Sequence, residues 1–251
     1  MELLFVHGAL VRDGAWWWQP TADLLHETTG IRSRAVALPS CGERETGTTD
    51  TGTTESGATE SGTPEGGLVE DAAALRRALD AVDPDTGAIV VGHSYGGTVI
   101  AEAGHHPAVR HLVLVSSYLP AVGQAQAGIM SGESDPVAIA DHGDGTLGVS
   151  GYDAASFGAR FLQDADAATQ QGAWERVTAQ SAAAFVTPTT RAGGQDVDST
   201  VIVCTDDRST SVALQREHAA RATRSVELPT GHHPFITRPD LVVEQLTALL
   251  G

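Results

Sequence analysis

The stretch Val90-Val91-Gly92-His93-Ser94-Tyr95-Gly96-Gly97 decides the fold of this chain. An apolar run stops at a glycine, presents one serine and continues into a helix-like segment of small residues. This pattern predicts a strand, a tight turn and a helix, as in a G-x-S-x-G nucleophile elbow. Gly92 and Gly96 relieve crowding in the turn, and the Tyr95 N–H at the helix start can stabilise an oxyanion beside Ser94. Ser94 is therefore the candidate nucleophile.

Apolar runs alternate with helix-like segments on both sides of this turn. The expected strands are residues 3–6, 31–38, 88–91, 109–115, 199–204 and 225–228, and the expected helices are residues 15–27, 68–82, 98–103, 212–222 and 239–250. Wholly apolar strands separated by helices are typical of a parallel sheet that is covered on both faces. The sequence predicts an α/β fold with a mostly parallel, doubly wound sheet of about six strands.

Two segments depart from this alternation. Residues 43–67 form a tract rich in Thr, Gly and Glu without one large apolar side chain, whereas residues 121–198 contain helix-like patches and no evident strand. The first is expected to be a solvated, acidic low-complexity loop, with a lid over the site as the alternative. The second is expected to be a helical cap inserted after the fourth strand, which leaves residues 1–120 and 199–251 as the core. Such an excursion leaves the carboxyl edge of the sheet and would cover Ser94.

Composition narrows the class of partner. The chain has 251 residues, a hydrophobic fraction of 41% and a formal net charge of −17. That charge disfavours nucleic acid and anionic membranes, so a small-molecule substrate is expected, and a homodimer is compatible with the sequence. The absence of a basic leader and of an apolar run of roughly 20 residues predicts a cytoplasmic protein without a membrane span. Cys41 and Cys204 are expected to be separate buried thiols, and neither a metal site nor a cofactor is expected.

A serine hydroxyl becomes a good nucleophile only when a base takes its proton, and histidine suits that task near neutral pH. His232 follows the last expected strand and emerges at the same sheet edge as Ser94. Asp206 and Asp207 follow the preceding strand, and from spacing alone either could orient the histidine. The resulting order of serine, aspartate and histidine is the order of α/β-hydrolases. His93 directly precedes the nucleophile and is expected to point the opposite way.

These motifs together resemble the α/β-hydrolase superfamily. The elbow, His-Gly-Ala at residues 7–9, Gly-Ala-Trp at 14–16 and Gly-His-His-Pro at 231–234 look like one branch of it. That branch consists of small esterases and includes plant methyl-salicylate and methyl-jasmonate esterases, hydroxynitrile lyases and many bacterial relatives. The resemblance covers nearly the whole chain apart from residues 43–67, and it is weakest in the cap.

The resemblance implies a set of site residues. Ser94, His232 and Asp207 would form the catalytic triad, with Asp207 preferred over Asp206 because it matches the family aspartate. The backbone N–H groups of Ala9 and Tyr95 would form the oxyanion hole.

One departure from the branch bears on the reaction. The lyases carry a threonine where this chain has Gly8 and a lysine where it has His233, so cyanohydrin cleavage is disfavoured. The expected function is hydrolysis of a small-molecule ester, or of a related thioester or lactone, through an acyl-enzyme on Ser94. Two alternatives are a hydrolase-fold receptor for a small molecule and a cofactor-free cyclase, dehydratase or lyase that uses the same triad.

Overall fold

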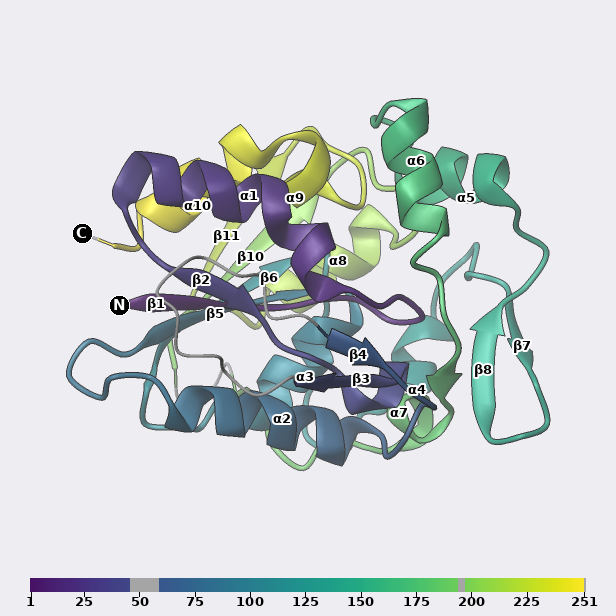
Figure 1. Cartoon of the computed structure of the whole chain (residues 1–251), viewed down its shortest axis with the longest axis horizontal. Helices are drawn as coiled ribbons and strands as arrows, with labels where there is room; N and C mark the ends of the chain where they lie inside the picture. The colour runs from purple at the N-terminus through teal and green to yellow at the C-terminus, as the bar shows by residue number, and fades with distance from the viewer. Residues whose placement is uncertain (46–58, 194–196, 251) are drawn as a thin grey trace.

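A single parallel sheet of six strands forms the centre of the molecule (Figure 1). The computed structural model describes residues 1–45, 59–193 and 197–250. The strands lie in the order β11-β10-β6-β5-β1-β2, and every neighbouring pair is parallel. Their bounds are β1 (Glu2–Val6), β2 (Ser33–Ala35), β5 (Ala88–His93), β6 (Val109–Val115), β10 (Ser199–Cys204) and β11 (Arg224–Leu228). The predicted fold class is confirmed.

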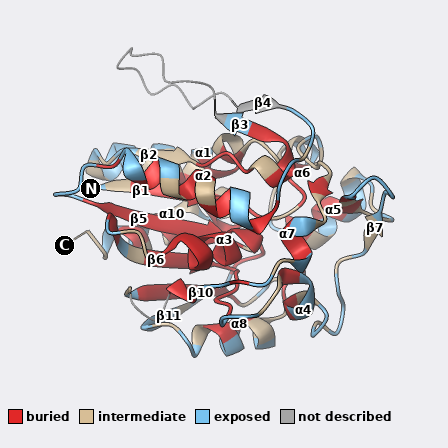
Figure 2. Ribbon diagram, turned by 90° about the horizontal axis from the view of Figure 1, so that it is seen from below, coloured by how far each residue is buried: buried red, intermediate tan, exposed pale blue. Residues whose placement is uncertain are grey.

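Helices cover both faces of this sheet (Figure 1). One face carries α1 (Gly14–Thr29), α9 (Pro234–Thr237) and α10 (Pro239–Thr247), and the other carries α2 (Leu68–Asp80) and α3 (Tyr95–Ala103). Successive residues of a strand point to opposite faces. Accordingly Val90 belongs to the apolar core beneath α2 and α3, whereas Val91 belongs to the core beneath α1 and α10. Figure 2 shows β5, β6 and β10 as largely buried strands.

The second strand is shorter than its apolar pattern predicts. Residues 31–38 were expected to be extended, but only Ser33–Ala35 form β2, which lies at the sheet edge. Val36 and Leu38 are nevertheless buried, because the chain then turns into the 3-10 helix η1 (Pro39–Cys41) and packs them into the core. Burial rather than strand pairing explains the apolar run.

The acidic tract is partly ordered around one buried carboxylate. Residues 46–58 lie outside the described residues, so the expected loop or lid is untested there. On either side of them, β3 (Glu43–Glu45) pairs antiparallel with β4 (Thr59–Ser61). Glu43 is only 2% exposed, and its carboxylate lies 2.8 Å from His7 Nε2. The expectation of a wholly solvated tract is therefore wrong at Glu43.

Residues 121–198 form the segment expected to be a helical cap. They contain α4 (Gln126–Met130), α5 (Ala154–Phe161), α6 (Ala167–Trp174) and α7 (Ala183–Val186). They also contain a three-stranded antiparallel sheet, β7-β8-β9, made of β7 (Ile139–Asp141), β8 (Thr146–Val149) and β9 (Gln180–Ser181). The segment is thus not purely helical. Strands of two to four residues are too short to give a recognisable alternating pattern.

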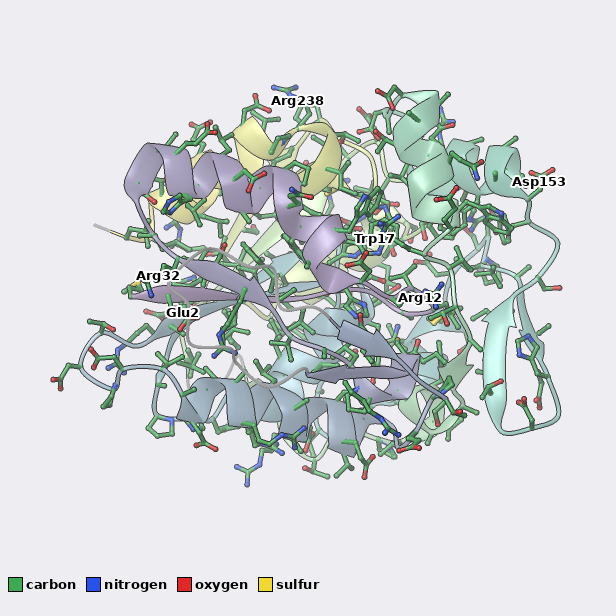
Figure 3. The ribbon with its side chains drawn as sticks, in the orientation of Figure 1. Glu2, Arg12, Trp17, Arg32, Asp153 and Arg238 are labelled. Carbon is green, nitrogen blue, oxygen red and sulfur yellow. The ribbon has the colours of Figure 1, made fainter. Side chains whose placement is uncertain are left out.

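The cap segment lies beyond the carboxyl ends of the central strands (Figure 1). In Figure 3, Arg12 and Trp17 lie toward the cap, whereas Glu2 and Arg32 lie at the opposite end of the sheet. A bridge between Val11 and Val177 joins the loop after β1 to the cap. The side chains that follow β1, β5, β6, β10 and β11 therefore gather beneath it. Among the described residues, no helix is both long and apolar enough to cross a bilayer.

The buried pair of His7 and Glu43 gives a prediction about stability. Burial lowers the pKa of His7, but the charge of Glu43 and the hydrogen bonds to Glu43 and Gly8 together outweigh burial and leave that pKa raised. Burial raises the pKa of Glu43, but the charge of His7 and the hydrogen bonds from His7, Leu38 and Asp13 together leave it lowered. The lowered Glu43 pKa stabilises the fold above the unfolded value of roughly 4.3, and the raised His7 pKa does so below roughly 6.5. The contribution of Glu43 is lost as pH falls through its pKa in the folded protein. The contribution of His7 is lost as pH rises through its pKa in the folded protein.

We therefore expect Glu43→Gln to reduce the free energy of unfolding by about 3 kcal/mol at pH 6, because it leaves a buried partner uncompensated. The reduction should be smaller at pH 9, because His7 carries less positive charge there than at pH 6. Urea unfolding at the two pH values measures both. The matched control is Glu65→Gln, which removes an exposed pair with Arg44 and should cost under about 1 kcal/mol. Equal losses in the two variants would rule out a structural role for the buried pair.

Candidate active site

Ser94 occupies a strained turn between β5 and α3. Its φ of 50° and ψ of −121° are rarely adopted by residues other than glycine. A Cβ on Gly92 would lie 2.8 Å from the carbonyl carbon of Gly96, and a Cβ on Gly96 would overlap the Val6 carbonyl oxygen. Both glycines are thus required by close backbone packing. The Ser117 hydroxyl donates to the Ser94 carbonyl at 2.6 Å and further fixes the turn.

Asp207 and His232 are paired at the same edge of the sheet. The distance from His232 Nδ1 to Asp207 Oδ2 is 2.8 Å, and the two side chains are 3% and 0% exposed. The other carboxylate oxygen of Asp207 accepts the N–H groups of Ser209 at 2.7 Å and Thr210 at 3.0 Å. Burial raises the pKa of Asp207, but His232 and these donors outweigh it and hold the pKa below its usual value. Asp207 is therefore a fixed, ionised acceptor.

The two candidate aspartates differ in their surroundings. Asp206 is exposed, and its described hydrogen bonds use only its backbone. Its N–H donates to the Thr230 carbonyl oxygen at 3.0 Å, and its own carbonyl oxygen accepts the side-chain N–H of Gln163 at 2.7 Å. The structure places Asp207, and not Asp206, next to His232.

Ser116 is a member of this cluster that the sequence did not single out. Its hydroxyl donates to Asp207 Oδ2 and lies 2.9 Å from His232 Nδ1. It follows β6 directly and has a positive φ of 43°, which turns its side chain toward the carboxylate. The available signal was its position, because a polar residue at the carboxyl end of a strand next to β5 must lie near the elbow.

Buried hydrogen bonds hold the loop after β1 and the elbow in place. Gln180 of the cap accepts the Leu10 N–H at 2.9 Å and donates to Ser40 Oγ at 2.9 Å. The Asp71 carboxylate accepts the hydroxyls of Ser40 at 2.6 Å and Tyr95 at 2.7 Å. Burial raises the pKa of both Asp71 and the Tyr95 phenol. These groups connect Leu10, which follows Ala9, to Tyr95, which follows Ser94.

The two expected oxyanion donors lie on these anchored segments. Tyr95 is the first residue of α3, so its N–H has no acceptor within that helix. Among the described residues, no hydrogen bond engages the N–H of Ala9, while that of Leu10 is held by Gln180. Both N–H groups are thus available to a ligand.

One pocket contains the reactive groups of this edge. Gly8, Ala9, Ser94 and His232 line it. Its other walls are largely apolar and come from the β1 loop and the cap, with Leu10, Val11, Met130, Val137, Ile139, Val149, Phe157, Phe161 and Phe185 among them. Within the described part of the chain, no hydrogen bond joins Ser94 to His232. In enzymes without substrate such contacts are often long and tighten on binding.

His93 and His233 also line this pocket. The expectation that His93 points away from the nucleophile is wrong, because its ring packs against that of His232 at a centroid distance of 4.5 Å. His233 stacks on Trp17 at 4.9 Å. Burial, with His232 nearby, lowers the pKa of His93 well below its usual value and that of His233 to about 3. Both imidazoles are therefore neutral.

The sequence matches the profile of the alpha/beta hydrolase family over residues 3–245. The chain belongs to this family. It is similar to the probable hydrolase R7 of Phoma sp., with 27% identity over 197 residues that cover 73% of this chain and 79% of the relative. It is also similar to an alpha/beta hydrolase, nvfD, of Aspergillus novofumigatus, with 24% identity over 72% of this chain and 78% of the relative.

Solved structures show the same fold. A pyrethroid hydrolase from Sphingobium faniae superimposes with a TM-score of 0.78 at 21% identity, covering 100% of this chain and 97% of that one. Polyneuridine aldehyde esterase superimposes with a TM-score of 0.72 at 16% identity, covering 100% of both chains. The fold of this family member is therefore that of known hydrolases, including an enzyme named as an esterase.

Proposed function

We propose that this alpha/beta hydrolase cleaves a small-molecule carboxylic ester through an acyl-enzyme on Ser94. The observation that carries the proposal is the buried 2.8 Å contact between His232 and Asp207, which lies at the pocket that also holds the strained Ser94. Because the ionised carboxylate of Asp207 accepts a hydrogen bond from Nδ1, the proton of a neutral His232 ring lies on Nδ1. The lone pair then lies on Nε2, which can accept a proton.

In the proposed acylation, Ser94 Oγ attacks the ester carbonyl as His232 Nε2 takes the serine proton. The N–H groups of Ala9 and Tyr95 stabilise the negative charge that develops on the carbonyl oxygen. Collapse of this intermediate breaks the bond to the alcohol, which receives the proton from His232. Deacylation repeats the sequence with water, whose proton His232 accepts, and releases the carboxylic acid.

The pocket walls favour an uncharged, apolar substrate. Phe157, Phe161 and Phe185 supply aromatic surface, and Glu133 adds a carboxylate to the lining. Desolvating a charged acyl group here would cost free energy without a cationic partner, and Glu133 would repel an anion. Neutral esters with aliphatic or aromatic groups are thus the proposed substrate class.

Covalent labelling tests the proposal against a receptor role. A fluorophosphonate should modify Ser94 stoichiometrically, because the same base and oxyanion donors activate the serine toward phosphorus, and peptide mass spectrometry locates the adduct. The presence of a p-nitrophenyl ester that the enzyme hydrolyses should slow the labelling. A folded protein that binds apolar ligands but resists labelling at Ser94 would favour the receptor.

A further inference from the structure

The rings of His93, His232 and His233 form a compact triangle in the pocket. Their centroids are 4.5 Å apart for His93 with His232, 4.5 Å for His93 with His233 and 4.8 Å for His232 with His233. One potential ligand nitrogen from each ring lies within 4.8 Å of those of the other two. The proposed ester hydrolysis uses only His232 and gives His93 and His233 no role. Their convergence on His232 therefore points to a different function.

In each of the three rings one nitrogen is already committed as a donor. His93 Nε2 lies 3.0 Å from the carbonyl oxygen of His232, and His233 Nδ1 lies 2.9 Å from that of Phe161. His232 Nδ1 lies 2.8 Å from the Asp207 carboxylate. Carbonyl and carboxylate oxygens only accept hydrogen bonds, so these nitrogens carry the protons. The lone pairs therefore reside on His93 Nδ1, His232 Nε2 and His233 Nε2.

This pattern is the one found around metal-binding histidines. A ligand histidine usually donates its other N–H to a carbonyl or carboxylate, which fixes the tautomer and orients the ring. Here all three partners are in place, and Trp17 stacks on His233 and limits its rotation. Glycine at position 8 keeps space open at His93, since a Cβ there would lie 3.0 Å from His93 Nδ1.

We propose that His93, His232 and His233 form a binding site for a borderline divalent cation such as Zn²⁺, and that the bound cation inhibits the enzyme. Imidazole nitrogens favour Zn²⁺, Cu²⁺ and Ni²⁺, whereas Mg²⁺ and Ca²⁺ favour oxygen ligands. Three histidines leave a fourth position of a tetrahedral Zn²⁺ open toward the pocket. Coordination takes the lone pair of His232 Nε2, so Ser94 loses its proton acceptor.

Binding and inhibition are separable. The inhibition rests on the proposed function, whereas the binding depends only on the three rings. Calorimetric titration of Zn²⁺ into Ser94→Ala therefore tests the site in a protein that keeps all three histidines. We expect one tight site that Mg²⁺ does not occupy, and at least a roughly 100-fold weaker affinity in Ser94→Ala with His233→Gln.

A matched control addresses adventitious binding to this acidic chain. His142 is exposed on the β7–β8 connection, and His142→Asn in the same background should leave the affinity unchanged. His93→Gln provides a second ligand variant in case His233→Gln does not fold, as judged by circular dichroism. Unchanged Zn²⁺ affinity in a folded ligand variant, or loss of affinity in His142→Asn, would overturn the site.

The activity arm uses the wild-type enzyme. Zn²⁺ should inhibit hydrolysis of a p-nitrophenyl ester, and EDTA should restore the rate. Tight binding in the calorimeter combined with full activity at saturating Zn²⁺ would overturn the inhibition while leaving the site intact. Failure of the enzyme to hydrolyse any ester would instead count against the proposed function, and the calorimetric result would stand by itself.

Discussion

Ser94→Ala should lower kcat for p-nitrophenyl ester hydrolysis by at least roughly 10⁴-fold. The variant keeps the pocket, His232, Asp207 and the backbone donors, and loses only the atom that would carry the acyl group. In a serine hydrolase, loss of the nucleophile removes about as much catalysis as loss of the whole triad. Steady-state assays with an active-site titration of the wild type measure the effect.

The matched control for this variant is Ser117→Ala. Ser117 neighbours the site and its hydroxyl donates to the Ser94 carbonyl at 2.6 Å, so its loss should affect the turn and not the chemistry. We expect a decrease of less than roughly 30-fold, which corresponds to one hydrogen bond of about 2 kcal/mol at most. If Ser94→Ala retained a rate comparable to Ser117→Ala, nucleophilic catalysis by Ser94 would be excluded.

Asp207→Asn should lower kcat by about 10⁴-fold at neutral pH. An amide at this position can donate to His232 Nδ1, which would place the imidazole proton on Nε2 and remove the base from Ser94. The neighbouring Asp206→Asn changes the same charge one residue away, but its carboxylate has no described contact with His232. We expect a change of less than threefold there.

The pair of variants thus separates orientation from general electrostatics. Because the pair of Asp207 and His232 is buried, the effect of Asp207→Asn should persist at high salt, whereas an effect of surface charge would be screened by salt. Assays of both variants in low and high salt measure the difference. Similar losses for the two aspartates would show that Asp207 is not the group that orients His232.

Much of the core fold was predictable because its signals are local. Short apolar runs predicted the strands at residues 109–115 and 199–204, and β6 and β10 have these same bounds. The elbow motif likewise marked the turn after β5. Parallel strands share a carboxyl edge, so Ser94, Asp207 and His232 could be expected to lie near one another from topology alone. The choice between adjacent aspartates was different, since it depends on side-chain burial that spacing does not encode.

The parts that were missed depend on contacts between distant segments. Glu43 lies in a polar tract, yet it is buried because it accepts the Asp13 N–H at 2.6 Å and the Leu38 N–H at 2.8 Å in addition to its contact with His7. His93 was expected to point away, since side chains alternate along a strand. The positive φ at Ser94 breaks this alternation and allows both residues to line one pocket.

Trapping the acyl-enzyme tests the central claim most directly. Wild-type protein mixed with excess p-nitrophenyl ester and quenched in acid during turnover should carry one acyl group, and peptide mass spectrometry should place it on the peptide containing Ser94. The release of p-nitrophenol should show a burst equal to the amount of acylated protein. An acyl group on a different residue during turnover would contradict the role of Ser94. Turnover that leaves Ser94 unmodified and shows no covalent intermediate, even where deacylation is slow, would contradict it as well.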